Sequence, residues 1–196
     1  MTGIVLAGGE NRRMGKEKAF LTLAGAPLIE HILKALRQAV SRIIIVTNSP
    51  AAYASYDATL TADVYDKRGP LTGIYSGLLN SHDDFNIVVA CDMPFLNPGL
   101  LSYMASLAGP YDIVLPKVGD FAEPLHAVYR RGLLAAIERR IKRDDQRIIG
   151  LLSDLRVRYV TEEDLDRFDP QRRSFINLNT PKDYEEAICL DLDCRS

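Results

Sequence analysis

The stretch VLAGGENRRMGKEKA (Val5–Ala19) joins the end of a short apolar run to a glycine pair and a cluster of positive charge. The run that leads into it, residues 3–7, is typical of a buried strand. The cluster contains four cations: Arg12, Arg13, Lys16 and Lys18. A flexible, cationic loop directly after a first buried strand predicts an anion-binding site at the carboxyl end of that strand.

The glycine pair, Gly8 and Gly9, has no Cβ atoms, so the backbone N–H groups of this loop can approach an anion or a base closely. Arg12, Arg13 and Lys18 can supply charge and donors to phosphate oxygens. A glycine-rich connection with solvated cations would have the same composition, so these residues alone leave both interpretations open. Two common phosphate loops are excluded, because the segment has neither the G-x-x-x-x-G-K-[ST] spacing of a P-loop nor the G-x-G-x-x-G spacing of a dinucleotide fingerprint.

Apolar runs and helical patterns alternate along the rest of the chain. The expected strands are 3–7, 42–48, 86–91, 111–117, 124–129 and 156–161, and the expected helices are 28–40, 69–80, 97–107, 133–141 and 180–190. Strands joined through helices predict an α/β fold with a mainly parallel sheet that is covered on both faces. Ligands of such sheets bind beyond the carboxyl ends of the strands, so the residues just after Ala7, Val46 and Cys91 form the candidate site.

Composition and charge fit a single domain, residues 1–196. Of the 196 residues, 47% are hydrophobic and 26% are charged, and the net charge is -2. We expect no nucleic-acid or membrane role, because the charges nearly balance and no apolar run approaches the roughly 18 residues of a membrane span. The N-terminus is interpreted as a strand and not a signal peptide, and the three cysteines predict a cytoplasmic, reducing location.

Five short motifs extend the pattern over most of the chain. In order they are L-A-G-G-x-x-x-R-M-G-x-x-K (Leu6–Lys18), GPLTGI (Gly69–Ile74), CDMPF (Cys91–Phe95), EPLHAVY (Glu123–Tyr129) and FINLNTPKDYE (Phe175–Glu185). Together they resemble the signature of the molybdenum cofactor guanylyltransferases, a family of nucleotidyltransferases. The resemblance implies a three-layer, Rossmann-like nucleotidyltransferase fold with a mainly parallel central sheet.

The resemblance also implies a nucleotide site. Its GTP-binding residues are Leu6, Ala7, Gly8, Gly9, Arg12, Lys18, Asn48, Asp63 and Asp92. Arg13, Lys18 and Asp92 are the implied catalytic residues, and Asp92 is the implied ligand of Mg²⁺, the expected cofactor. From the residues alone, Asp92 places a carboxylate at the tip of a buried strand, where a lone aspartate could equally begin a turn; beside a cationic loop we favour the Mg²⁺ ligand.

The resemblance implies guanine contacts in the regions of Asn48 and Asp63, and an amide and a carboxylate can hydrogen-bond the edge of that base. Asp66 is a rival to Asp63, since the spacing from Asp63 to Gly69 is about one residue shorter than the resemblance leads us to expect. A strand-end cap at Asn48 and a turn acid at Asp63 remain the structural alternatives.

The resemblance implies that the other side of the crevice accepts a second substrate, the pterin with its phosphate. The candidates are Gly69, Pro70, Leu71, His126, Asn177 and Asn179. Backbone N–H groups at the start of the helix 69–80 could bind an anion, with Arg68 adjacent. Asn177 and Asn179 would share one face if their segment is extended. A lone histidine in a strand is more often a structural residue, so His126 keeps both interpretations.

The implied reaction transfers GMP from GTP to the terminal phosphate of molybdopterin carrying molybdenum and releases pyrophosphate. Positioning and charge neutralisation suffice for such a transfer, and no nucleophile–base pair is evident in the sequence. Three alternatives remain: a cytidylyltransferase for the same cofactor, a guanylyltransferase for another small phosphorylated substrate, and a non-catalytic nucleotide- or partner-binding protein. The expected protein partners bind transiently and are cofactor-synthesis proteins or acceptor enzymes. The basic run at 138–145 is interpreted as a solvated helix face, with a docking surface for a partner protein as the alternative.

Overall fold

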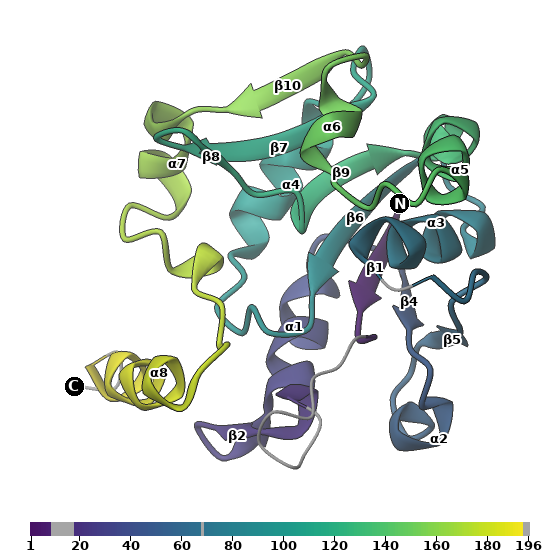
Figure 1. The fold of residues 1–196 in the computed structure, drawn as a ribbon. Helices are drawn as coiled ribbons and strands as arrows, with labels where there is room; N and C mark the ends of the chain where they lie inside the picture. The colour runs from purple at the N-terminus through teal and green to yellow at the C-terminus, as the bar shows by residue number, and fades with distance from the viewer. Residues whose placement is uncertain (9–17, 68, 194–196) are drawn as a thin grey trace.

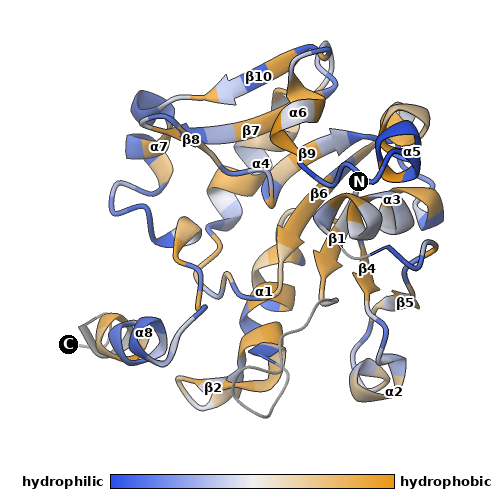
Figure 2. Cartoon of the chain, in the orientation of Figure 1, coloured by the Kyte–Doolittle hydropathy of each residue, from blue (hydrophilic) through white to orange (hydrophobic). Residues whose placement is uncertain are grey.

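Three parallel strands at the centre of one sheet carry the most apolar part of the sequence. The computed structural model describes residues 1–8, 18–67 and 69–193. β1 (Thr2–Leu6) lies between β4 (Arg42–Val46) and β6 (Phe85–Ala90) and is parallel to both. Nearly all side chains of these strands are buried, as expected for a sheet that is covered on both faces. Figure 2 shows the three strands as predominantly hydrophobic.

The full sheet has the order β10-β7-β9-β6-β1-β4-β5, with β8 paired to β7 (Figure 1). The outer strands are β5 (Thr59–Thr61), β7 (Ile113–Val118), β8 (Phe121–Ala122), β9 (His126–Arg130) and β10 (Val157–Val160). β9 is antiparallel to β6 and β7, and β8 is antiparallel to β7. The mainly parallel α/β sheet is therefore confirmed. β9 reverses direction because the short connection from β7 through β8 leaves no room for the crossover that a parallel strand requires.

Helices pack on both faces of this sheet. α1 (Leu28–Leu36) and α4 (Pro98–Ser106) contribute to one apolar core, and α3 (Pro70–Asn80) and α5 (Leu134–Lys142) contribute to the other. The helix predicted over 28–40 is confirmed but ends at Leu36, before Val40, and its apolar residues are buried: Leu28, Ile29, Ile32, Leu33 and Leu36. The two cores fix the sheet, and with it the positions of the strand ends.

Several short elements escape the sequence pattern. They are the hairpin β2 (Thr22–Leu23) and β3 (Ala26–Pro27), the strand β5, and the helices α2 (Pro50–Tyr53), α6 (Ile149–Leu152) and α7 (Glu162–Phe168). Such segments are too short to show a period, although α7 carries a capping box between Thr161 and Asp164. No helix among the described residues is both long and apolar enough to cross a membrane.

The C-terminal helix α8 (Pro181–Asp193) packs against the β2–β3 hairpin, away from the main sheet (Figure 1). Leu23, Leu178 and Ala187 are buried together in this small core. The Tyr184 hydroxyl also donates a hydrogen bond to the backbone carbonyl of Thr22. This packing brings the segment before α8 back toward the first motif, although most of the chain separates them in sequence.

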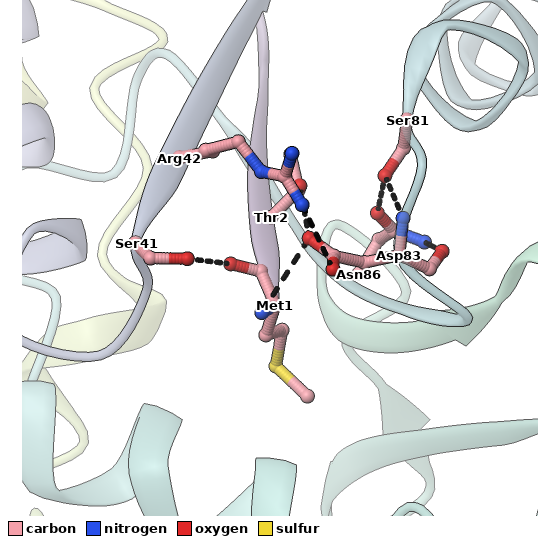
Figure 3. Close-up of polar contacts among 7 residues, drawn as sticks. All are labelled: Met1, Thr2, Ser41, Arg42, Ser81, Asp83 and Asn86. Atoms are coloured by element: carbon pink, nitrogen blue, oxygen red, sulfur yellow. Dashed lines mark hydrogen bonds and ion pairs between the residues drawn. The ribbon is translucent and has the colours of Figure 1, made fainter.

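The amino edge of the sheet is joined by a polar cluster around Asp83 (Figure 3). The Thr2 hydroxyl donates to the Asp83 carboxylate at 2.6 Å. Arg42 and the amino group of Met1 form ion pairs with the same carboxylate at 3.1 and 3.4 Å. Because β1 and β4 both supply partners, Asp83 ties the starts of adjacent strands together.

Ser81 extends this cluster at the end of α3 (Figure 3). Its buried hydroxyl donates to the side-chain oxygen of Asn86 and accepts a hydrogen bond from the Asp83 N–H at 3.1 Å. The Asn86 amide in turn donates to the Asp83 carbonyl at 3.1 Å. The turn between α3 and β6 is thus held by side chains whose polar groups have partners.

Candidate functional site

The candidate site lies at the opposite, carboxyl edge of the sheet. The Ala7 N–H donates to the Val46 carbonyl at 2.9 Å, and the Cys91 N–H donates to the Leu6 carbonyl at 3.2 Å. These bonds hold the ends of β1, β4 and β6 beside one another, as the sequence predicts. Leu6 and Ala7 are half-buried, whereas Gly8 is exposed just beyond them.

Lys18, Asp92 and Asn179 form one cluster at this edge. Lys18 begins a 3₁₀ helix (Lys18–Phe20) and is only 7% exposed. Its Nζ donates to Asn179 Oδ1 at 2.8 Å and lies 3.8 Å from Asp92 Oδ2. The structure therefore brings together a predicted catalytic cation, a predicted metal ligand and a residue that the sequence assigned to the second substrate.

Asp92 is a carboxylate with little solvent around it. Burial raises the pKa of its carboxyl above the usual range, and the attraction of Lys18 offsets this only in part. Among the described residues, no group of three or more histidine, cysteine or acidic side chains gathers to hold a metal. Magnesium does not need one, since it is often bound by one or two carboxylates together with substrate phosphates and waters. Asp92 fits that use, because its charge is only partly compensated by the protein.

Asn179 is fixed from behind by the start of α8. The carboxylate of Asp183 accepts hydrogen bonds from the N–H groups of Asn179 and Thr180, at 2.9 and 2.8 Å. The hydrogen bond from the Thr180 N–H is the main reason that the pKa of Asp183 lies below its usual range. The backbone is tied to Asp92 as well, because the Leu178 N–H donates to the Asp92 carbonyl at 3.0 Å.

Asn177 does not share the environment of Asn179. The segment turns, with the Asn179 N–H donating to the Asn177 carbonyl at 3.1 Å, so the extended geometry that would put both side chains on one face is absent here. The Asn177 amide instead donates to the carbonyl of Phe175 at 3.1 Å. Of the two asparagines, Asn179 is the one whose side chain contacts Lys18.

Asn48 and Asp63 form a reciprocal pair after β4 and β5. The Asn48 amide donates to Asp63 Oδ2 at 3.0 Å, and the Asp63 N–H donates to Asn48 Oδ1 at 3.2 Å. A Cβ on Gly8 would lie 3.5 Å from Asp63 Oδ2, so the pair borders the first loop. Burial raises the pKa of the Asp63 carboxyl, and its Oδ1 is buried with no hydrogen-bond partner in the described part of the chain. Asp66, its rival, is exposed.

The predicted anion site at the start of α3 is covered by Gln146. The Thr72 N–H donates to Gln146 Oε1 at 3.3 Å, and Gln146 Nε2 donates to the Thr72 hydroxyl at 3.0 Å. Gly69 has φ of 150°, and a Cβ there would lie 2.6 Å from Gln146. Gly69 and Pro70 are exposed, whereas Leu71 is fully buried in the core. No sequence pattern marks Gln146, because its position depends on how the loop after α5 packs.

His126 is fully buried, with its ring centroid 5.2 Å from that of Phe175. Neither ring nitrogen has a hydrogen-bond partner among residues 1–8, 18–67 and 69–193. Burial lowers the pKa of His126 to about 4, so the ring is neutral at physiological pH. This environment favours the structural interpretation of His126 over a contact with substrate.

The remaining predicted site residues, Gly9, Arg12 and Arg13, lie outside the described residues, as does Arg68. The described residues of the first motif nevertheless border both clusters: Gly8 is next to Asp63, and Lys18 is next to Asp92. The edge therefore combines a buried cation, two desolvated carboxylates and an exposed glycine.

This chain is similar to known proteins over nearly its whole length. The sequence model of the MobA-like NTP transferase domain matches residues 3–182. The molybdenum cofactor guanylyltransferase of Desulfosudis oleivorans is 36% identical over 189 residues, which cover 95% of this chain and 94% of that protein. A probable molybdenum cofactor guanylyltransferase of Peptoclostridium acidaminophilum is 34% identical over 192 residues, covering 94% and 87%. The crystal structure of molybdopterin-guanine dinucleotide biosynthesis protein A from Archaeoglobus fulgidus has a TM-score of 0.86 and 32% identity, covering 98% of this chain and 100% of that one.

Proposed function

We propose a reaction for this chain from the premise that it belongs to the MobA-like NTP transferase family and is a nucleotidyltransferase. The reaction is transfer of GMP from GTP to the terminal phosphate of molybdopterin carrying molybdenum, with release of pyrophosphate. Relatives that are named for guanylyl transfer to the molybdenum cofactor match nearly the whole chain, which supports this choice. The observation that carries it is the cluster in which Lys18 Nζ lies 3.8 Å from Asp92 Oδ2 at the carboxyl edge of the sheet.

The chain contributes charge and position. A phosphate oxygen of molybdopterin attacks the α-phosphorus of GTP, and the bond from that phosphorus to the β-phosphate oxygen breaks. Lys18, held by Asn179, donates to phosphate oxygens and stabilises the negative charge that moves onto pyrophosphate. Asp92 would hold Mg²⁺, which when bound supplies further positive charge to the phosphates. Arg12 and Arg13 keep their proposed roles as additional phosphate-binding cations.

Guanine recognition is assigned to the Asn48–Asp63 pair. A carboxylate suits the N–H donors of guanine, and Asp63 Oδ1 is an acceptor without a partner in the described part of the chain. Backbone groups of Leu6, Ala7, Gly8 and Gly9 would complete the nucleotide site. Asp63 is preferred over Asp66 because it is partly buried and oriented by Asn48.

The second substrate is assigned to the side of Gly69 and Pro70, which are exposed, although Gln146 already occupies the nearby N–H of Thr72. Leu71 can offer only its backbone there, and Asn177 keeps a subsidiary role. We place the reaction in the cytoplasm, with transient contacts to the proteins that supply or receive the cofactor.

Nucleotide binding tests the proposal. Binding of GTP, CTP, UTP and ATP is measured with and without Mg²⁺, for the wild type, for Asp92→Ala and for Asp83→Ala as a matched control at the amino edge. We expect Mg²⁺-dependent preference for GTP that Asp92→Ala loses and Asp83→Ala keeps, followed by pyrophosphate release when molybdopterin is added. Preference for CTP would point to the cytidylyl reaction, and absence of nucleotide binding would overturn the enzymatic proposal.

A further inference from the structure

Two polar side chains of α3 bind the segment on both sides of Asp63: Ser76 binds backbone after it, and Asn80 binds a side chain before it. The Ser76 hydroxyl, in a fully buried residue, accepts a hydrogen bond from the Val64 N–H at 2.9 Å and donates to the Thr72 carbonyl at 2.8 Å. One turn later, the Asn80 amide donates to the Thr61 hydroxyl at 3.0 Å and to the Ser76 carbonyl at 2.9 Å. Thr61 and Val64 flank Asp63, so α3 fixes the segment that presents this carboxylate.

The other supports of Asp63 are weaker. β5 is a three-residue strand at the edge of the sheet, and among the described strands it pairs with β4 alone. Asn48, the direct partner of Asp63, is exposed, and hydrogen bonds open to water contribute little net stability. Ser76 is the buried anchor of this segment, because both its donor and its acceptor capacity are used away from solvent.

The anchor continues to the second loop of the site. Thr72, whose carbonyl accepts from Ser76, is the residue whose N–H and hydroxyl bond to Gln146 over Gly69. A hydrogen-bonded series therefore runs from Gln146 through Thr72 and Ser76 to Val64. It joins the loop assigned to the second substrate with the loop assigned to the base.

We propose that Ser76 is a positioning residue for base recognition, which holds the Asp63 loop so that its carboxylate faces the edge of guanine. The inference rests on the proposed function, in which Asp63 reads the base. Ser76 touches no substrate; it acts through the Val64 backbone. Its loss should therefore reduce discrimination between bases more than it reduces phosphate binding.

The test compares two buried serines. Ser76→Ala removes hydrogen bonds to Val64 and Thr72, and the matched control Ser81→Ala removes hydrogen bonds to Asn86 and Asp83 at the other edge. For the wild type and both variants, we would measure the melting temperature and the affinities for Mg²⁺-GTP, Mg²⁺-ITP (which lacks the 2-amino group) and Mg²⁺-ATP. We expect both variants to melt earlier, but only Ser76→Ala to lower the GTP preference, by about three- to tenfold, the effect of loosening hydrogen bonds that aim an acceptor.

A double variant distinguishes positioning of the Asp63 carboxylate from a general loss of rigidity. In Asp63→Ala, which has no carboxylate to aim, Ser76→Ala should cause no further loss of base preference. If Ser76→Ala does not fold, the exposed residue Asn80 gives the second variant, and Asn80→Ala should shift the preference in the same direction by a smaller factor. This inference alone would be overturned if Ser76→Ala kept the wild-type preference for GTP, or if Ser81→Ala lost as much of that preference. Where Ser76→Ala does not fold, an unchanged preference in Asn80→Ala would overturn it in the same way. Absence of GTP preference in the wild type would instead overturn the proposed function and this inference with it.

Discussion

Asp83 and Asp92 lie just before and just after the same strand, β6, and their environments are opposite. Asp83 accepts from Thr2 and pairs with Arg42 and the Met1 amino group; the hydrogen bond from Thr2 is the main reason that its pKa lies below the usual range. Asp92 has Lys18 at 3.8 Å as its charged partner, and burial raises its pKa.

The two edges of the sheet therefore differ in how an ionised carboxylate affects the stability of the fold. At the amino edge, an ionised carboxylate stabilises the folded state, because its partners favour the charged form. At the carboxyl edge, an ionised carboxylate costs stability until a cation binds it. Functional sites often keep such uncompensated groups, and the rest of the structure holds them in place.

Asp92→Asn is the most direct test of the contrast between Asp92 and Asp83. Because the folded state favours the neutral form of Asp92, an amide of the same shape should leave the melting temperature at neutral pH equal or higher. The proposed guanylyl transfer should fall by roughly a thousandfold, since the amide cannot supply the charge that holds a divalent cation. Calorimetry and pyrophosphate release measure the two effects.

The matched control for that variant is Asp83→Asn, which should lose stability and keep its activity per folded molecule. A melting temperature of Asp92→Asn several degrees below the wild type would mean that the Lys18–Asp92 pair stabilises the fold after all. Retained transfer activity would remove Asp92 from the proposed metal site.

His126 extends the comparison, because it is a second desolvated group at the carboxyl edge, paired with Val89 of β6. Burial lowers its pKa from 6.5 to about 4, so between these pH values the unfolded chain takes up a proton that the folded chain refuses. The free energy of unfolding should therefore fall as the pH falls through this window, by about 3 kcal/mol from this residue. His126→Leu should lose less stability between pH 7 and pH 4 in urea titrations, and exposed His82→Ala should behave as the wild type. Parallel curves for His126→Leu and the wild type would contradict the neutral, buried assignment.

Asn179 tests whether the carboxyl edge depends on how Lys18 is held. Asn179→Ala removes the 2.8 Å acceptor of Lys18 Nζ and should weaken Mg²⁺-GTP binding about tenfold, because the cation is no longer aimed at the phosphates. Asn177→Ala is the matched control, since its side chain donates only to the Phe175 carbonyl among the described contacts. The effect of Asn179→Ala should vanish in a Lys18→Ala background. Unchanged GTP affinity would return Asn179 to the second-substrate role that the sequence predicted.

Much of the core could be predicted because burial leaves a simple pattern. Ile43–Val46 in β4 and Ile87–Ala90 in β6 are continuous apolar segments, and the apolar residues of α1 have helical spacing. β5 could not be predicted, since a three-residue edge strand with two threonines has no period. The reversed direction of β9 follows the β7–β8 hairpin, in which only two residues of each strand are paired.

The candidate site divides in the same way. The place of Lys18 and Asp92 at the carboxyl edge of the sheet could be predicted, because each lies in a motif that follows a buried strand, β1 or β6. The partners that orient them could not: Asn179 is 161 residues from Lys18, and its contact depends on α8 packing against the β2–β3 hairpin. Gln146 over Gly69 is likewise a product of loop packing, and nothing in its local sequence indicates it.

The smallest effect is expected at the edge where the charge is well compensated. Asp83→Asn should lower the free energy of unfolding at pH 7 by about 1 kcal/mol, a value reduced by the partial exposure of the ion pairs. The folded-state pKa of Asp83 lies below 3.8, so its stabilisation is complete above that pH and is lost as the pH falls through the lowered pKa. Urea titrations at pH 7, 5 and 3 should therefore show a constant difference between wild type and variant at the first two values and a smaller one at the third. A difference of equal size at pH 3 would mean that the shape of the side chain stabilises the amino edge, and the contrast between Asp83 and Asp92 would then not be one of charge.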